Sequence, residues 1–200
     1  MPIVGITGGV ASGKSTFRRL FLERFDAEFF DADACARELI DSNETVREQI
    51  LEKVSPAAYD RSGHPDRNLL REIIYNDIAK KKTLEGILHP KIRERWTSKA
   101  REISRHDRAF VVDIPLLFET RADSLFDHII VVAASEASQL QRMITIRKLS
   151  LDLARKILAS QWSMDVKLRG AHHVVWNDSS LALLESQADL LAAYFRQQYD

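Results

Sequence analysis

The chain has 200 residues, which suits one domain with a small insertion, and its 45% hydrophobic residues are enough to bury a core. Its 29 basic and 29 acidic residues give a net charge of zero, which argues against a protein that binds nucleic acid without sequence preference. Cys35 is the only cysteine, which excludes an internal disulfide, and no stretch approaches the roughly 20 apolar residues that cross a bilayer. Since no basic leader precedes the first apolar run, we expect a cytoplasmic protein that binds neither membranes nor nucleic acid; the oligomeric state is not visible in the sequence.

Short apolar runs predict buried strands, and apolar residues three or four positions apart predict helices with one buried face. For the first half of the chain these patterns predict strands at 2–7 and 27–30, helices at 13–25, 33–40 and 44–54, and a loop at 55–67. Ser42 and Asn43 form a capping signal in front of the third of these helices. The charged stretch 69–104 is mostly helical in pattern, with a break expected around His89 and Pro90. Because it lacks strands, it predicts a helical insertion.

The alternation of strands and helices then resumes. The same patterns predict strands at 109–114, 127–133 and 173–176, and helices at 136–146, 151–160 and 181–197. Strands that alternate with helices form a parallel sheet covered on both faces, so we predict an α/β fold with a parallel β-sheet flanked by helices. Ligands bind such sheets at the carboxyl ends of the strands, where a glycine loop, the pair Asp31 and Asp33, and Asp113 all follow their strands.

The glycine loop after the first strand carries the strongest motif. Residues 8–15, GGVASGKS, match the phosphate-binding pattern G-x-x-x-x-G-K-[ST] in full, which chance produces in about one chain of this length in a hundred. Backbone N–H groups of such a loop bind phosphate oxygens, Lys14 reaches the β- and γ-phosphates of ATP, and the Ser15 hydroxyl completes a Mg²⁺ shell. The alternative, a glycine-rich turn with an incidental lysine, is disfavoured by the strand before the loop and the helix after it. The expected ATP-binding residues are Gly8, Gly9, Ala11, Ser12, Gly13, Lys14, Ser15 and Thr16.

Three classes of protein share this P-loop: small-molecule kinases, GTPase switches and ATP-driven motors. A GTPase normally carries an N-K-x-D motif that reads guanine, and this sequence lacks one. A motor normally has an apolar strand that ends in Asp-Glu, whereas Asp113 is followed by Ile114 and Pro115, and the chain is too short for a motor's extra domains. A compact fold with a helical insertion fits a small kinase best. A module that binds ATP without transferring phosphate is the alternative from another class.

Two carboxylates follow the second strand. In extended backbone Asp31 and Asp33 face the same side, so both can point into the cleft over the P-loop. A kinase that acts on an alcohol benefits from one carboxylate that accepts the hydroxyl proton and another that orients water around Mg²⁺. The spacing does not decide which acid is the base, and capping of the next helix is the alternative for Asp33. Asp113 is either a residue near the metal or a hydrogen-bonding acid at the end of its strand.

The late segment 136–170 is rich in basic residues and resembles a lid. If the helix at 136–146 continued, Arg147 would lie on its apolar stripe, so this arginine must leave the helix or point into a cleft. Arginines such as Arg142 and Arg147 neutralise the charge of a transferred phosphoryl group, and on a lid they keep water out; a solvated basic helix face is the alternative. Arg67 in the insertion is either a surface arginine or a clamp for a phosphate of the acceptor.

Several sequence elements, in this order, resemble those of the dephospho-coenzyme A kinase family. They are GITGG with SGKST at 5–9 and 12–16, DAD at 31–33, LEGILHP at 84–90, IPLLFE at 114–119 and QLQR at 139–142. Gln161, Lys167 and Asn177 also hold the late spacing of this family, so the resemblance extends over roughly residues 3–180. Ala11 departs from it, because the family usually has glycine at this position.

The resemblance implies a kinase that uses ATP and Mg²⁺ to phosphorylate the ribose 3′-hydroxyl of dephospho-coenzyme A; a kinase for another nucleoside or nucleotide is the nearer alternative. It implies Asp33 as the general base and Asn177 as a further ATP contact. From the motifs and the resemblance together, we expect the catalytic residues to be Asp33, Lys14, Arg142 and Arg147. The expected acceptor contacts are Asp33, Arg67, His89 and Leu117, and the expected metal ligands are Ser15 and Asp31, partly through water. The resemblance also implies three parts in one domain: a nucleotide core at 1–54, 107–135 and 171–200, a substrate-binding helical insertion at 55–106, and a lid at 136–170.

Overall fold

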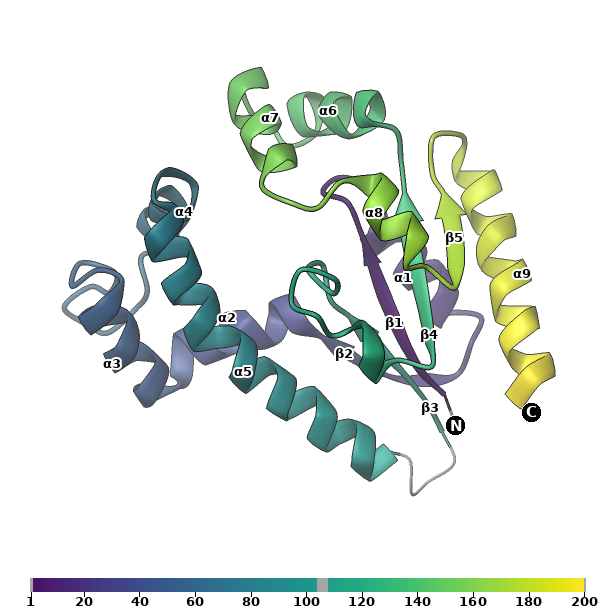
Figure 1. The fold of residues 1–200 in the computed structure, drawn as a ribbon, viewed down its shortest axis with the longest axis horizontal. Coiled ribbons are helices and arrows are strands. Elements are labelled where there is room, and N and C mark those ends of the chain that lie inside the picture. The colour runs from purple at the N-terminus through teal and green to yellow at the C-terminus, as the bar shows by residue number, and fades with distance from the viewer. Residues whose placement is uncertain (1, 104–107, 200) are drawn as a thin grey trace. The chain divides into compact units, whose positions relative to one another are not determined.

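The structure is a computed structural model, and it describes residues 2–103 and 108–199. The chain folds into two compact units, a sheet unit made of residues 1–31 and 99–200 and a helical unit made of residues 32–98 (Figure 1). The helical unit therefore begins before the insertion that we predicted at 55–106, and the far end of that predicted insertion lies outside the described residues.

Five parallel strands form the sheet of the sheet unit, as the alternation of strands and helices predicts. Their bounds are β1 Ile3–Gly8, β2 Ala27–Asp31, β3 Ala109–Asp113, β4 His128–Ala133 and β5 His173–Trp176. The strand order is β2-β3-β1-β4-β5, so the strand that precedes the P-loop is central. Asp31 and Asp113 are partners in the register of β2 with β3, which brings the carboxyl ends of these two strands side by side.

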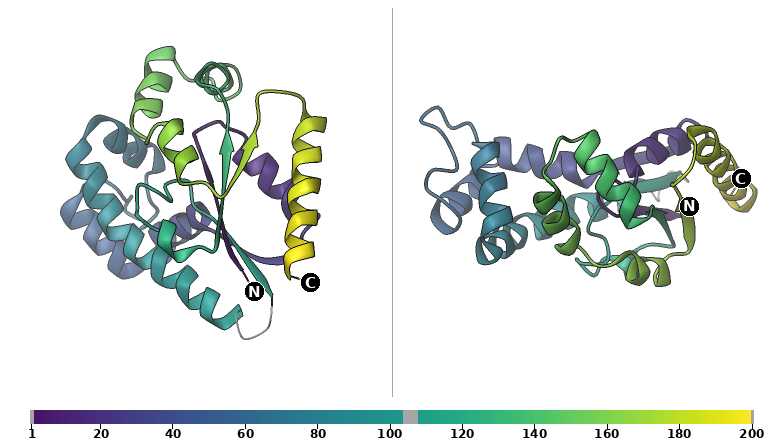
Figure 2. Two further views of the ribbon diagram at one scale, coloured as in Figure 1. Left: turned by 45° about the vertical axis from the view of Figure 1, so that its right-hand side comes forward. Right: turned by 90° about the horizontal axis from the view of Figure 1, so that it is seen from above.

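Helices cover both faces of this sheet, with α1 and α9 on one face and α8 on the other (Figure 2). The helices of the sheet unit are α1 Lys14–Leu22, α6 Glu136–Thr145, α7 Leu151–Ala159, α8 Met164–Arg169 and α9 Leu181–Tyr199, with a short 3₁₀ helix at Asp123–Leu125. The main core lies between the sheet, α1 and α9, where Phe17, Phe21 and Phe195 are fully buried. The rings of Phe17 and Phe21 stack with their centroids 5.7 Å apart. This packing fixes α1, and with it the point at which the P-loop meets its helix.

Four helices make up the helical unit. Their bounds are α2 Ala32–Ser42, α3 Glu44–Lys53, α4 Arg67–Asn76 and α5 Ile78–Ile103, the last of which continues into the sheet unit. The side chain of Asn43 accepts a hydrogen bond from the N–H of Val46 at 3.0 Å, which confirms the predicted cap of α3. The predicted break around Pro90 is wrong, because α5 runs through it. Proline removes only one hydrogen bond of this long helix, and the buried side chains of Leu84 and Leu88 hold the turns before it.

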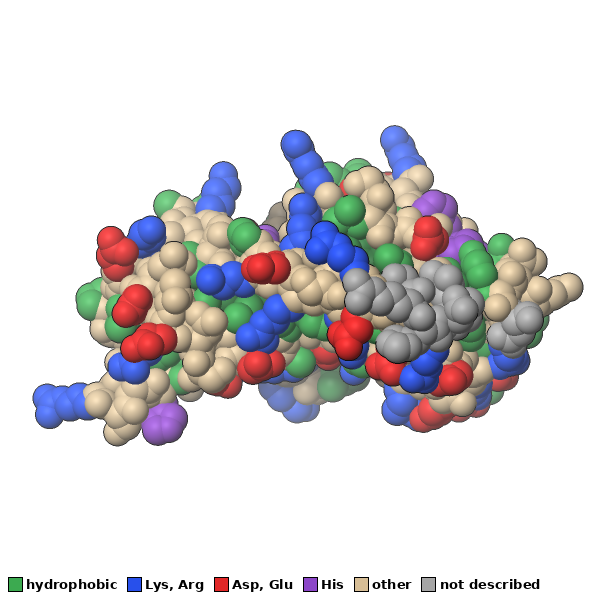
Figure 3. Space-filling view, turned by 90° about the horizontal axis from the view of Figure 1, so that it is seen from below, with side chains coloured by type: hydrophobic (Ala, Val, Ile, Leu, Met, Phe, Trp, Pro, Cys, Tyr) green, Lys and Arg blue, Asp and Glu red, His purple; other side chains and the backbone are tan. Residues whose placement is uncertain are grey.

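None of the helices within residues 2–103 and 108–199 is both long enough and apolar enough to span a bilayer. On the face shown in Figure 3, Lys and Arg side chains are interspersed with Asp and Glu side chains. This mixture of signs is what the balanced composition of the chain predicts.

Candidate active site

The P-loop between β1 and α1 turns through residues with left-handed backbone. Ala11 has a φ of 55°, and Gly13, which caps α1, has a φ of 89°. A Cβ atom on Gly13 would lie 2.0 Å from Nδ2 of Asn177, so only glycine fits at this position. Turns that alternate right- and left-handed residues point successive N–H groups at one place, and the positive end of the α1 dipole lies there as well. The loop is therefore built to bind an anion.

Ala11 shows how a residue other than glycine takes this conformation. Left-handed backbone costs an L-residue about 1–2 kcal/mol. The Ala11 methyl group packs against a small apolar cluster formed by Met143, Ala154 and Ile157. Full burial of one methyl group stabilises by about 0.8 kcal/mol, so the partial burial of Ala11 offsets part of the strain.

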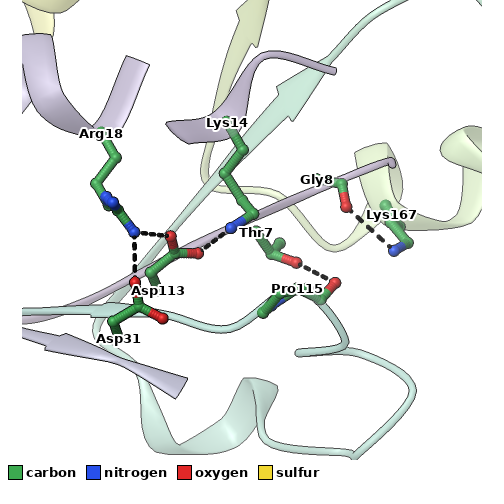
Figure 4. A network of polar contacts seen from close by, with 8 residues as sticks. All are labelled: Thr7, Gly8, Lys14, Arg18, Asp31, Asp113, Pro115 and Lys167. Carbon is green, nitrogen blue, oxygen red and sulfur yellow. Dashed lines mark hydrogen bonds and ion pairs between the residues drawn. The ribbon is translucent and has the colours of Figure 1, made fainter. Parts of the chain in front are cut away.

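Four charged side chains form one network at the carboxyl ends of β2 and β3 (Figure 4). Lys14 forms an ion pair with one oxygen of Asp113, and the other oxygen accepts a hydrogen bond from Nη1 of Arg18 at 2.8 Å. The same Nη1 donates to a carboxylate oxygen of Asp31 at 2.9 Å. The side chain of Asp113 is only 2% exposed. Asp113 is thus the ion-pair partner of the P-loop lysine in this structure.

Sequence reasoning assigned no role to Arg18. Its guanidinium carbon lies 4.9 Å from the centroid of the Phe29 ring, and its head group connects two acids from neighbouring strands. A signal was present, because Arg18 follows Lys14 by four residues and a helix places residues four apart on the same face. The parallel register of β2 and β3, which brings the two acids together, was not available from the sequence.

Two of the predicted residues contact the P-loop backbone. Asn177 donates from Nδ2 to the carbonyl oxygen of Ser12 at 2.8 Å. Arg142 donates from Nη1 to the carbonyl oxygen of Ala11 at 3.2 Å and from Nη2 to that of Asn177 at 2.6 Å. Arg147 is exposed and lies beyond the end of α6 at Thr145, so it leaves the helix as we expected. The structure therefore brings Arg142 and Asn177 to the loop by direct hydrogen bonds.

A second ion pair, between Lys167 and Glu119, lies next to the P-loop. Lys167 follows the two helices predicted for the lid. Lys167 is completely buried, and its Nζ lies 2.9 Å from Oε1 of Glu119. It also lies 3.5 Å from the carbonyl oxygen of Gly8 (Figure 4). Oε1 of Gln161 accepts a hydrogen bond from the N–H of Val10 at 3.1 Å. The sequence showed the spacing of Lys167 but not its buried contacts with Glu119 and Gly8, because a lysine in a charged segment ordinarily faces water.

The predicted magnesium ligands have the donor chemistry that this ion prefers. Ser15 is exposed in the first turn of α1, and the Asp31 side chain is 23% exposed at the end of β2. Mg²⁺ binds hard oxygen donors, keeps several waters and commonly uses one or two carboxylates together with substrate phosphates. Among the described residues there is no group of three or more His, Cys, Asp or Glu that could hold a metal ion. The hydroxyl of Ser15 and the carboxylate of Asp31 are donors of the kind that Mg²⁺ prefers.

The residues that we expected to contact the acceptor are placed as follows. Asp33 lies in the first turn of α2, inside the helix rather than in front of it. The expectation that Asp31 and Asp33 face the same side of an extended segment is therefore wrong. Arg67 opens α4 and donates to both carboxylate oxygens of Asp41 at 2.6 and 2.7 Å. His89 is half-buried within α5, and burial lowers its pKa below the ordinary value. Leu117 is a fully buried residue of the sheet unit.

The chain is similar to several known proteins of one family. The dephospho-CoA kinase family model matches residues 2–182. A dephospho-CoA kinase from Fusobacterium nucleatum subsp. nucleatum is 36% identical over 179 residues, which cover 90% of this chain and 91% of that protein. Another from Hahella chejuensis is 34% identical over 196 residues and covers 96% of this chain and 91% of its own. The solved structure of a dephospho-CoA kinase from Campylobacter jejuni has a TM-score of 0.73 at 29% identity and covers 98% of each chain. By sequence and by fold, this chain belongs to the dephospho-CoA kinase family.

Proposed function

We propose that the protein transfers the γ-phosphoryl group of ATP to the ribose 3′-hydroxyl of dephospho-coenzyme A, which gives coenzyme A and ADP. Membership of the dephospho-CoA kinase family over residues 2–182 carries this proposal. The P-loop supports it, because its left-handed turns and the dipole of α1 suit the phosphates of a nucleoside triphosphate. The reaction is the last step of coenzyme A synthesis.

In the proposed complex, the triphosphate lies on the backbone N–H groups of the P-loop. Lys14 turns from Asp113 to the β- and γ-phosphates, where its charge offsets the charge that develops during transfer. The ATP contacts are Gly8, Gly9, Ala11, Ser12, Gly13, Lys14, Ser15, Thr16 and Asn177. The contact of Asn177 with the Ser12 carbonyl supports its place in this set.

We propose that Ser15 and Asp31 hold Mg²⁺, with Asp31 acting partly through water. When it is bound, Mg²⁺ neutralises charge on the β- and γ-phosphates. Ser15 supplies a hydroxyl oxygen at the start of α1, and Asp31 supplies a carboxylate at the end of β2. Arg18 already holds one oxygen of Asp31, which favours contact through a water molecule over a direct bond to the metal.

Asp33 is the proposed general base. It accepts the proton of the 3′-hydroxyl while that oxygen bonds to the γ-phosphorus, and the bond from this phosphorus to the oxygen of the departing ADP breaks. The DAD element at 31–33, which the family match includes, supports this role. Arg142 and Arg147 are proposed to neutralise the transferred group, and the hydrogen bond from Arg142 to Ala11 already places that arginine at the loop.

The acceptor is proposed to contact Arg67, His89 and Leu117 in addition to Asp33. Arg67 suits an anionic phosphate, because its Nη2 already donates to both carboxylate oxygens of Asp41. Burial lowers the pKa of His89 and favours its neutral ring, which can both donate and accept a hydrogen bond. We also propose a cytoplasmic location, because the lone buried thiol of Cys35 suits a reducing compartment.

A panel of acceptors tests this function. The purified protein is supplied with ATP and Mg²⁺, and ADP formation is measured with dephospho-coenzyme A, adenosine and AMP. We expect efficient turnover with dephospho-coenzyme A and a lower kcat as well as a higher KM for the two smaller acceptors, because binding of the pantetheine arm helps to position the hydroxyl. Equal kcat/KM for adenosine would instead indicate a nucleoside kinase. ATP binding without turnover of any acceptor would indicate a module that only binds ATP.

A further inference from the structure

Two acids of the site are neighbours on adjacent strands. Asp31 ends β2, Asp113 ends β3, and the two residues are partners in the parallel register. Like charges that lie side by side on neighbouring strands repel each other. The repulsion matters most for Asp113, whose side chain is only 2% exposed and is therefore poorly screened by water.

Arg18 is the residue that joins these acids. Its Nη1 atom donates to Asp113 at 2.8 Å and to Asp31 at 2.9 Å, so one nitrogen uses its two N–H groups on two carboxylates. The ring of Phe29, 4.9 Å from the guanidinium carbon, helps to hold the head group in place. The Arg18 side chain is 24% exposed, so water weakens these interactions only in part.

The ion pair between Lys14 and Asp113 creates a conflict with catalysis. The ammonium group of Lys14 cannot bind the phosphates of ATP and keep its ion pair with Asp113 at the same time. When it turns away, the buried carboxylate of Asp113 loses one of the two cationic partners that it has among the described residues. A buried carboxylate without any cation is strongly disfavoured, and this penalty would oppose the binding of ATP.

We propose that Arg18 is a positioning residue that keeps Asp113 paired when Lys14 moves from this carboxylate to the phosphates of ATP. Arg18 touches neither ATP nor the acceptor in this role and acts through Asp113. Because it stands between the two acids, it also holds Asp31 in a fixed orientation. The inference rests on the proposed function only in taking ATP as the ligand.

Equilibrium binding of ATP, measured by calorimetry with Mg²⁺ and without any acceptor, tests this role. The variant Arg18→Gln keeps a polar side chain but removes the charge. Arg19→Gln is the matched control, because Arg19 is the next residue of α1 and forms a surface ion pair with Glu23 at 2.7 Å. We expect Arg18→Gln to weaken ATP binding at least about tenfold, since Asp113 then has neither Arg18 nor Lys14 as its ion-pair partner when Lys14 moves. We expect Arg19→Gln to change it less than about twofold.

The same substitution in an Asp113→Asn background separates this role from a general effect on fold or charge. The neutral amide that replaces the carboxylate in this background needs no counter-ion, so Arg18→Gln should there weaken ATP binding less than about threefold. An unchanged affinity in Arg18→Gln, or the same loss in both backgrounds, overturns the proposal. If Arg18→Gln alone does not fold, ATP binding of the double variant Arg18→Gln/Asp113→Asn is compared with that of Asp113→Asn. The double variant should then bind ATP less than about threefold more weakly. A wild-type protein that fails to bind ATP contradicts both the proposed function and this role, whereas failure to use dephospho-coenzyme A contradicts only the proposed function.

Discussion

The buried ion pair of Lys167 with Glu119 makes the sharpest prediction about stability. Lys167→Met keeps the length of the side chain and removes its charge and its donors. The substitution removes the cation beside Glu119, which is 15% exposed and whose Oε1 also accepts a hydrogen bond from the N–H of Trp162 at 3.0 Å. Among the described residues, Oε2 of Glu119 has no hydrogen-bond partner at all. The variant therefore leaves an uncompensated carboxylate in the core.

The magnitude follows from this burial. Removal of one partner of a buried ion pair costs about 3–5 kcal/mol. Because the Glu119 side chain is 15% exposed, water can partly solvate its charge, and we expect a loss near the lower end of this range. That is a large share of the roughly 5–15 kcal/mol by which a domain is stable. With a urea m-value of about 2 kcal/mol/M, the unfolding midpoint should fall by about 1.5 M.

Urea unfolding followed by circular dichroism measures this loss. Lys156→Met is the control, because Lys156 is an exposed lysine of α7, and its effect should stay within about 0.5 kcal/mol. The double variant Lys167→Met/Glu119→Gln removes the stranded charge and should recover at least about half of the loss. A loss below about 1 kcal/mol for Lys167→Met, or strictly additive losses in the double variant, would refute this reasoning.

Three further predictions concern the reaction and its pH range. Lys14→Ala should keep the fold, as circular dichroism can check, and lower the rate of transfer at least about tenfold, because charge stabilisation supplies most of this catalysis. Asp33→Asn should lower kcat by about 10²–10⁴ with little change in ATP affinity, whereas Asp31→Asn should change the dependence on Mg²⁺; rescue of Asp33→Asn by added Mg²⁺ would reverse the two roles. Burial lowers the pKa of His128 and of His173, so the unfolded chain binds more protons and stability falls as the pH drops below about 6.5. Urea midpoints between pH 7 and pH 5 should fall less in a His128→Gln/His173→Gln variant than in the wild type.

The elements that position the site could be predicted because their signals are local. The strand before the P-loop is a short apolar run, and Gly13 stands where the backbone is left-handed. The cap at Asn43 follows from its residue type and position. These features depend on chemistry within a few residues, which the sequence shows directly.

The features that the sequence did not reveal depend on distant residues. Arg18 is placed by the register of two strands whose ends are far apart in the chain. Lys167 lies on a helix of six residues, which is too short to show a periodic apolar face, and its partner Glu119 is distant in sequence. The prediction of a helix break around Pro90 is wrong for the opposite reason. The proline is a local signal for a break, but packing of the surrounding turns outweighed it.

Identification of the product tests the central claim most directly. The purified protein is incubated with ATP, Mg²⁺ and dephospho-coenzyme A, and the product is examined by phosphorus NMR and mass spectrometry. The account predicts one new phosphomonoester at the ribose 3′ position, formed in step with ADP and absent with Lys14→Ala. Release of ADP without this ester, or a new phosphate at another position, would contradict it.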